Sequence, residues 1–239
     1  MALLEGRKIS KSFGGVQALS NVDFAVEPAT IVGLIGPNGA GKTSLFNVVA
    51  GLFKPTSGRV VFDGQDITGL SANAVCRKGM ARTFQVARPF GAMTCLENVM
   101  VAAVNRHPHR PRPFIEGFAR EKLSLVGLTN MAGFEARHLN VVQKKRLEMA
   151  RALATEPKLL MLDEVLGGLN TQEISQAVEF IRSLRDRLKL TVLWIEHVMG
   201  AIMQAAERVI VLDQGQVLMV ASPNEVVNDP RVIQAYLGE

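Results

Sequence analysis

The sequence predicts an α/β fold in which a mostly parallel β-sheet is covered by helices on both faces. Short apolar runs of strand length alternate along the chain with segments of helical period, which is typical of βαβ units. One of these runs also leads into a glycine-rich segment that is followed at once by a helical pattern. The chain has 239 residues, of which 48% are hydrophobic, so a disordered protein is excluded.

The first part of the chain predicts three strands and a helix. Residues 8–12 and 16–26 alternate between polar and apolar side chains, and the two glycines at 14–15 are a turn signal between them. Residues 30–35 form an apolar run that ends in glycine, as a buried strand does. Residues 43–52 then have the pattern of a helix.

The middle of the chain has a different character. A strand at residues 59–62 is followed by segments of helical pattern near 95–104 and 114–126, joined by loops rich in proline and glycine. We therefore expect residues 86–140 to form a helical subdomain inserted between two halves of the α/β core. Residues 106–113 combine basic side chains with alternating prolines, which predicts a solvated loop without a helix.

The last part of the chain predicts two helices, two buried strands and a hairpin. The helices lie at residues 143–154 and 171–188, and Asn170 is a suitable N-cap for the second. The buried strands lie at residues 159–162 and 190–195. The hairpin is expected from two runs separated by a turn signal, residues 208–212 and 216–220.

Composition narrows the classes of function. The net charge of +5 would suit nucleic acid, but aromatics make up only 5% and none interleaves with the arginines of residues 106–113, so no nucleic-acid partner is expected. The sequence has neither a signal-peptide pattern nor a run of about twenty apolar residues, so at a membrane we expect other chains to hold it. Cys76 and Cys95 lie far apart and predict reduced thiols.

The strongest functional signal is a phosphate-binding loop, or P-loop, which matches G-x-x-x-x-G-K-[ST] at every fixed position. Its glycines let successive backbone N–H groups point at phosphate oxygens, and the following helix adds the positive end of its dipole. We expect Lys42 to reach the β- and γ-phosphates and the Thr43 hydroxyl to ligate Mg²⁺. The predicted nucleotide-binding residues of this segment are Gly36, Pro37, Asn38, Gly39, Ala40, Gly41, Lys42, Thr43 and Ser44.

A P-loop alone does not identify the reaction, because it also serves kinases, GTPases and motors. Two carboxylates reduce the number of reaction classes that fit. Asp163 and Glu164 end the apolar strand predicted at 159–162. Asp163 suits the outer shell of the Mg²⁺, and Glu164 can polarise a water molecule for in-line attack on the γ-phosphorus. A nucleotide kinase would not need a carboxylate at the position of Glu164.

With these motifs the whole chain, residues 1–239, resembles the ATP-binding family of ABC transporters. The resemblance implies a P-loop NTPase (RecA-like) core with an antiparallel β subdomain and the inserted helical subdomain, and it implies ATP and Mg²⁺ as ligands. It also implies roles for three further residues. Gln85 would contact Mg²⁺ and water and sense the membrane subunits, His197 would contact the γ-phosphate, and Phe13 would stack on adenine.

The family's signature segment, which completes the ATP site of the partner subunit, corresponds here to an unusual sequence. Where the family has L-S-G-G-Q, this chain has Leu139, Asn140, Val141, Val142 and Gln143. Valine places branched side chains where glycine would let the backbone approach the phosphate closely. The chain is therefore expected to support its partner's ATP poorly, which predicts a heterodimer with a second, different ATP-binding subunit. Val165 and Val198 also depart from the family, which has proline and aspartate there.

A narrower resemblance is to the importers of branched-chain amino acids and related amides. It lies in residues 81–85, 168–170, 196–197 and 229–239. It implies two membrane permease subunits, an external solute-binding protein and a peripheral position on the cytoplasmic face of the inner membrane.

The residues leave several alternatives open. The chain could serve an importer of another small solute such as an amide, or it could be a soluble ABC ATPase of DNA repair or translation, although it has no room for the long insertions of those proteins. A nucleotide-binding scaffold without hydrolysis is disfavoured by the set Lys42, Gln85, Asp163, Glu164 and His197. Neither the solute, the choice between ATP and GTP, nor the choice between homodimer and heterodimer follows from the residues themselves.

Overall fold

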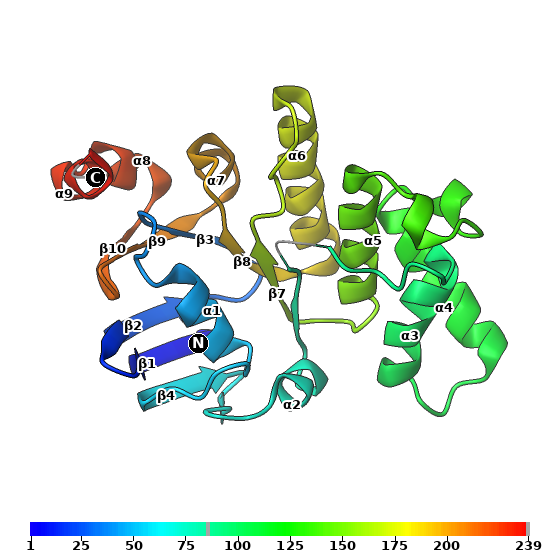
Figure 1. The fold of residues 1–239 in the computed structure, drawn as a ribbon, viewed down its shortest axis with the longest axis horizontal. Helices are drawn as coiled ribbons and strands as arrows, with labels where there is room; N and C mark the ends of the chain where they lie inside the picture. The colour runs from blue at the N-terminus through cyan, green and yellow to red at the C-terminus, as the bar shows by residue number, and fades with distance from the viewer. Residues whose placement is uncertain (85–86, 238–239) are drawn as a thin grey trace.

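The computed structural model of the chain describes residues 1–84 and 87–237 (Figure 1). Its smaller sheet is antiparallel and has four strands in the order β2-β1-β4-β5. These strands are β1 (Leu4–Phe13), β2 (Val16–Val26), β4 (Ser57–Phe62) and β5 (Gln65–Asp66).

The larger sheet has six strands in the order β10-β9-β3-β8-β7-β6. All neighbouring strands in it are parallel except β9 and β10, which form an antiparallel hairpin at one edge. β3, β7 and β8 are buried at every residue, which explains why their sequences are continuous apolar runs. The strands are β3 (Ile31–Ile35), β6 (Met80–Arg82), β7 (Leu159–Asp163), β8 (Thr191–Ile195), β9 (Arg208–Asp213) and β10 (Gln216–Ala221).

Two apolar cores cover the faces of this larger sheet. Because side chains alternate along a strand, Leu160 and Leu162 of β7 face one core while Leu159 and Met161 face the other. One core joins the sheet to helix α1 (Lys42–Val49) and the smaller sheet. The other core joins it to further helices, including the long α6 (Thr171–Leu188) and the short α7 (Met199–Ala205).

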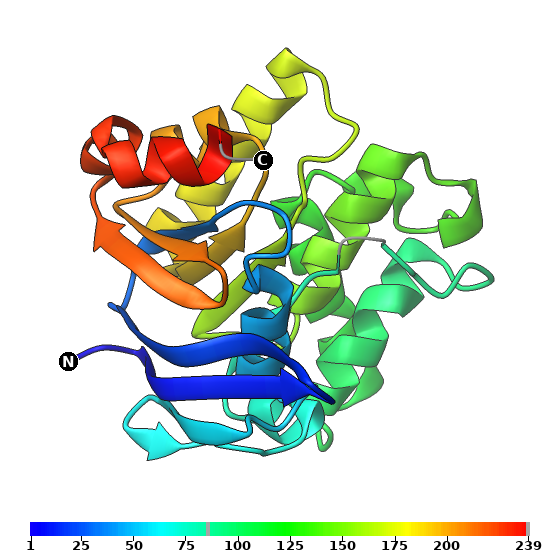
Figure 2. The ribbon, with the colours of Figure 1, turned by 60° about the vertical axis from the view of Figure 1, so that its left-hand side comes forward.

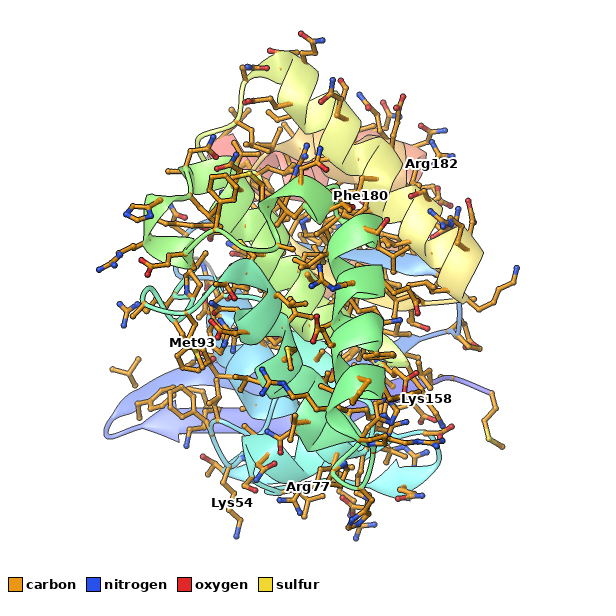
Figure 3. All side chains as sticks on the ribbon, turned by 90° about the vertical axis from the view of Figure 1, so that its right-hand side faces the viewer. Lys54, Arg77, Met93, Lys158, Phe180 and Arg182 are labelled. Carbon is orange, nitrogen blue, oxygen red and sulfur yellow. The ribbon has the colours of Figure 1, made fainter. Side chains whose placement is uncertain are left out.

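A group of helices connects β6 to β7, its parallel neighbour in the sheet. This group contains α3 (Cys95–Arg106), α4 (Arg112–Leu125) and α5 (Val141–Leu153), with two short 3₁₀ turns at Thr129–Met131 and Ala136–His138. Figure 3 looks onto this side of the molecule, where α3 and α4 (green) stand in front of the sheet. The helices lie far from β1 and β2 along the longest axis of the molecule, as Figure 1 shows.

The structure confirms the α/β fold class, and it also corrects several boundaries. The loop expected over residues 106–113 is shorter, because Arg106 still belongs to α3 and both Arg112 and Pro113 already belong to α4. Proline is tolerated there since the first turn of a helix does not use its N–H. The helix expected to run to residue 52 ends at Val49, and Gly51 turns the chain with a φ of +74°.

Some short elements were not predicted from the sequence. Besides β5, β6 and α7, they are α2 (Ala72–Arg77), α8 (Pro223–Asn228) and α9 (Pro230–Leu237). Among the described residues, no helix has both the length and the apolar character needed to cross a bilayer.

Candidate active site

The P-loop connects the buried strand β3 to helix α1. It lies at the edge of the larger sheet where the parallel strands have their carboxyl ends. Two of its glycines sit where a side chain would collide with neighbouring backbone. A Cβ at Gly36 would lie 2.0 Å from Leu212 O, and a Cβ at Gly41 would lie 2.6 Å from Ala18 O. Both also have positive φ, 150° and 98°, which glycine adopts readily. The loop is thus pressed against the β9–β10 hairpin and β2, while its tip at Asn38 and Gly39 is exposed.

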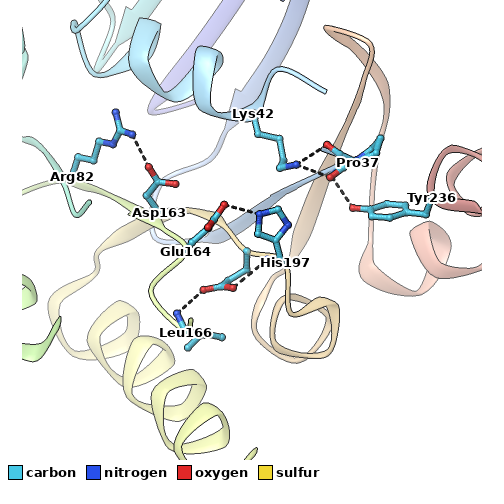
Figure 4. A network of polar contacts seen from close by, with 10 residues as sticks. Pro37, Lys42, Arg82, Asp163, Glu164, Leu166, His197 and Tyr236 are labelled. Atoms are coloured by element: carbon cyan, nitrogen blue, oxygen red, sulfur yellow. Dashed lines mark hydrogen bonds and ion pairs between the residues drawn. The ribbon is translucent and has the colours of Figure 1, made fainter. Parts of the chain in front are cut away.

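Lys42 begins helix α1 and is buried, and its ammonium turns back onto the loop (Figure 4). Its Nζ donates hydrogen bonds to Gly36 O at 2.6 Å and to Pro37 O at 2.8 Å. Thr43, the next residue, is exposed, and Ser44 is half-buried. The amides of this loop, the lysine and the threonine hydroxyl are the donor set that a nucleoside triphosphate with its metal requires.

Asp163 is buried at the carboxyl end of β7 and is paired with an arginine that the sequence analysis did not single out. Arg82, at the end of the neighbouring strand β6, donates from Nη2 to Asp163 Oδ2 at 2.6 Å. Arg82 also donates from Nη1 to Asn47 Oδ1 of α1 at 2.5 Å. The arginine therefore links the carboxylate to the helix that follows the P-loop, through one of the two oxygens of Asp163.

Glu164 and His197 follow the adjacent strands β7 and β8 and contact each other (Figure 4). His197 Nε2 lies 2.6 Å from Glu164 Oε1. Glu164 has a φ of +49°, which is rare for a residue with a side chain and costs on the order of 1–3 kcal/mol. Its N–H donates to Ile195 O at 3.0 Å, so strand β8 holds this unusual conformation in place.

Glu196 is a second residue that the sequence analysis did not assign to the site. Its buried carboxylate accepts hydrogen bonds from Leu166 N at 2.7 Å and His197 N at 3.1 Å. Burial raises the pKa of Glu196 above the ordinary value, and the backbone donors oppose that shift. The side chain thus ties the segment that follows Glu164 to the backbone of His197.

Helix α5 contacts both sides of the site. Lys145 Nζ donates to Val165 O at 3.0 Å and to Gly167 O at 2.5 Å, just after Glu164. Glu148, one turn further on, accepts from Phe84 N at 2.8 Å, just before Gln85. Burial raises the pKa of Glu148 and lowers that of Lys145. Gln85 itself, predicted to contact Mg²⁺, lies outside the described residues.

Phe13, the predicted adenine platform, ends strand β1, and the residue is 42% exposed. Phe53 packs edge-on against it with ring centroids 5.3 Å apart, and the Lys11 ammonium lies 4.8 Å from the ring centroid. Phe53 is itself fixed to helix α1, because its N–H donates to Asn47 O at 3.1 Å. The aromatic pair therefore stands next to the end of the helix that begins at Lys42.

The signature segment forms the start of helix α5, which begins at Val141 and not at the expected residue 143. Asn140 is the N-cap: its side chain accepts from Gln143 N at 2.8 Å, and Gln143 Oε1 accepts from Asn140 N at 3.0 Å. This capping box explains the early start. Val141 is 63% exposed, whereas Leu139 is buried.

The arrangement brings together, at the carboxyl ends of β3, β7 and β8, the predicted Lys42, Asp163, Glu164 and His197. Ligands of parallel α/β sheets bind at this edge. Among the described residues there is no group of three or more His, Cys, Asp or Glu side chains that could hold a metal by themselves. The Thr43 hydroxyl and the Asp163 carboxylate are oxygen ligands of the kind that Mg²⁺ prefers, and in phosphoryl-transfer sites the ion takes its other ligands from phosphate oxygens and water.

Comparison with known families and sequences gives two matches to families. Residues 19–167 match the ABC transporter family, and residues 216–239 match the family described as branched-chain amino acid ATP-binding cassette transporter. The chain is 39% identical to the high-affinity branched-chain amino acid transport ATP-binding protein BraF of Pseudomonas aeruginosa. The matched stretch covers 99% of this chain and 98% of BraF. It is also 39% identical to the corresponding protein LivG of Escherichia coli K12, with the same coverage.

Solved structures give the same picture of the fold. The chain resembles a nucleotide-free ATP-binding cassette from an ABC transporter with a TM-score of 0.88 and 28% identity, over the full length of both. It also resembles the structure of an ABC transporter ATP-binding cassette in its ADP conformation, with a TM-score of 0.89 and 29% identity, again over the full length of both.

Proposed function

Because the chain belongs to the ATP-binding family of ABC transporters, we propose that it is the subunit that binds and hydrolyses ATP to power import of branched-chain amino acids. The observation that carries this proposal is the convergence of the Lys42 loop, Asp163 and the Glu164–His197 pair at one edge of the larger sheet. The ATPase activity follows from the family, and the solute is inferred from the names of the relatives and from the match of residues 216–239.

Each side chain has a role that its position supports. The loop amides and Lys42 bind the β- and γ-phosphates, which requires the ammonium to exchange its present carbonyl partners for phosphate oxygens. Thr43 would ligate Mg²⁺ and Asp163 would hold its outer shell, together with the predicted contact from Gln85. The chemistry that a bound Mg²⁺ would supply there is neutralisation of the charge that develops on the phosphate oxygens.

Glu164 orients the attacking water, and His197 holds Glu164 and reaches the γ-phosphate. The 2.6 Å contact between them keeps the carboxylate oxygen directed into the site. The carboxylate polarises the water and accepts its proton as the bond from the water oxygen to the γ-phosphorus forms and the bond from that phosphorus to the leaving oxygen of ADP breaks. Phe13 stacks on the adenine of ATP.

The membrane partner is proposed to bind in a large groove on the side of the molecule that carries α2, α3 and α5. The groove has a volume of about 1120 Å³ and reaches from Val101 and Arg106 on α3 to Asp163 of the site. Phe84 and Val101 are exposed on its wall. Since Phe84 is adjacent to Gln85, a permease segment in this groove would contact the residue predicted to sense it. We propose accordingly that the chain lies peripherally on the cytoplasmic face of the inner membrane.

The first test is binding of the nucleotide. At a hundredfold excess over Kd, Mg-ATP should add about 2.7 kcal/mol to the free energy of unfolding. For a chain of this size the melting temperature should rise by roughly 5–10 °C. A Lys42→Ala variant is the matched control and should show little of this rise. Absence of any rise for the native chain in millimolar Mg-ATP would contradict the proposal.

The second test is transport. The chain is purified with its two permeases, a second ATP-binding subunit and the solute-binding protein, and the complex is reconstituted in proteoliposomes. We expect ATP-dependent uptake of leucine, isoleucine or valine in preference to small amides. Preference for an amide would favour the alternative importer, and failure to assemble with any membrane subunit would favour a soluble ABC ATPase.

A further inference from the structure

The C-terminal helix α9 contacts the P-loop through the single tyrosine of the chain. The Gly36 N–H donates a hydrogen bond of 2.8 Å to the phenol oxygen of Tyr236 (Figure 4). The two residues are 200 positions apart in the sequence. None of the steps proposed above for ATP binding or hydrolysis uses Tyr236.

Helix α9 is held firmly enough to position this phenol. Helix α8 begins with a capping box between Ser222 and Glu225 and buries Val226 completely. Asp229, between the two helices, accepts bonds from the backbone and guanidinium of Arg231, which lower the pKa of the aspartate to about 2. Val232 of α9 is buried in the core shared with the larger sheet. Figure 2 shows the two red helices side by side next to α7.

Gly36 is the residue at which the chain leaves β3 and enters the phosphate-binding loop. Its carbonyl accepts from Lys42 Nζ, its N–H donates to Tyr236, and the space that a Cβ would occupy is filled by Leu212 O. The N–H and the carbonyl of Gly36 are therefore both hydrogen-bonded, and no space remains for a side chain on its Cα. Burial raises the pKa of the Tyr236 phenol, with the bond from Gly36 opposing the shift, so the phenol stays neutral at physiological pH.

We propose that Tyr236 is a positioning residue that fixes the start of the P-loop in its phosphate-binding conformation. This inference rests on the proposed ATPase function and assigns to the C-terminal segment a part in binding the nucleotide. Without the phenol oxygen, the Gly36 N–H loses its partner and the loop must be ordered by the phosphates themselves. The phenol acts on the loop in the same way before and during hydrolysis, so its loss weakens binding and spares turnover.

The test compares Tyr236→Phe, which removes only the oxygen, with the control Leu237→Ala, which alters the adjacent, 79% exposed residue of the same helix. For Tyr236→Phe we expect the Kd and KM for Mg-ATP to rise about 5- to 10-fold while kcat at saturation stays within about twofold. For Leu237→Ala both should stay at the native values. A Tyr236→Phe variant with native Kd and KM would overturn the proposal, as would an equal effect of the control.

A second measurement uses the native sequence. Biosynthetic 3-fluorotyrosine labels the one tyrosine of the chain, and its ¹⁹F resonance reports the surroundings of the phenol. Saturating Mg-ATP should shift this resonance, whereas adenosine, which has no phosphate, should leave it unchanged. If a thermal-shift measurement shows that the protein binds Mg-ATP and the ¹⁹F resonance nevertheless stays unchanged, the role of Tyr236 is overturned. A native protein that binds no Mg-ATP at all would instead contradict the proposed function.

Discussion

The separation between Glu164 and His197 is set by backbone contacts as well as by the two side chains. Glu164 follows β7, and its N–H is bonded to Ile195 O of β8. The backbone of His197 is bonded to the carboxylate of Glu196, which also holds Leu166. Neighbouring strands and a buried carboxylate thus fix both ends of the 2.6 Å contact, as pre-organised catalysis requires.

Glu164→Gln tests the role of the carboxylate. Glutamine keeps the shape of the side chain and the contact to His197, but it has no charge with which to orient water. We expect normal Mg-ATP binding and a fall in turnover of about a hundredfold or more, by analogy with the loss of other pre-organised groups. Phosphate release and nucleotide titration measure the two quantities. Turnover within a factor of two of the native value would mean that Glu164 is structural.

Phe13→Ala tests the adenine platform. If the ring stacks on the base, its removal should weaken Mg-ATP binding by roughly 1–3 kcal/mol. Phe53→Ala is a useful comparison, because Phe53 contacts the ring of Phe13 edge-on and would act through it. Its effect on the Kd should therefore be smaller than that of Phe13→Ala. Unchanged affinity in Phe13→Ala would remove this residue from the site.

At the scale of elements, helix α5 connects the segment that follows Glu164 to the segment that precedes Gln85. Lys145 and Glu148 lie one turn apart on this helix, and they hold the backbone at residues 165–167 and at Phe84. The helix that carries the signature segment is thereby bonded to the chain next to both Gln85 and Glu164. A shift of α5 would move these segments together.

Lys145→Met tests this link. Methionine preserves the aliphatic length but cannot donate to Val165 O and Gly167 O, so the segment after Glu164 loses its anchor. We expect kcat to fall about 5- to 20-fold while the Kd for Mg-ATP stays within about twofold, since the effect is confined to the placement of Glu164. Lys144→Met is the matched control, because no hydrogen bond or ion pair of the Lys144 ammonium occurs among the described residues. Equal kinetics of the two variants would contradict the role of Lys145.

The sequence was most informative where the signal was local. The P-loop and the Asp163–Glu164 pair were found because each motif is contiguous and lies between recognisable elements. Arg82 and Tyr236 were missed because their partners are 81 and 200 positions away. Helices α8 and α9, with 6 and 8 residues, are too short for their period to be recognised. An arginine and an aspartate ending adjacent parallel strands could have been paired once the strand order was known.

At the scale of the whole molecule, the chain combines a P-loop that has every residue of its motif with a signature segment whose sequence is altered. Val141 and Val142 occupy the first turn of α5, and Val141 is 63% exposed at the surface that would meet a partner's nucleotide. The side-chain oxygen of Asn140 is already used to cap the helix, so its amide is the group left to face the partner. Two copies of this chain would form two such altered sites, whereas a partner with an intact signature would complete the site built on Lys42.

The assembled transporter should therefore depend unequally on its two ATP-binding subunits. Glu164→Gln in this chain should nearly abolish solute uptake by proteoliposomes, whereas the matching change in the partner subunit should leave a substantial fraction. The reason is that the partner's own P-loop would face Val141 and Val142, which would hold the backbone N–H groups away from the γ-phosphate. Replacing both valines by glycine should raise the low ATPase rate of this chain alone. Equal loss of uptake from both subunits would refute the asymmetry, and so would a vigorous ATPase of the unaltered chain by itself.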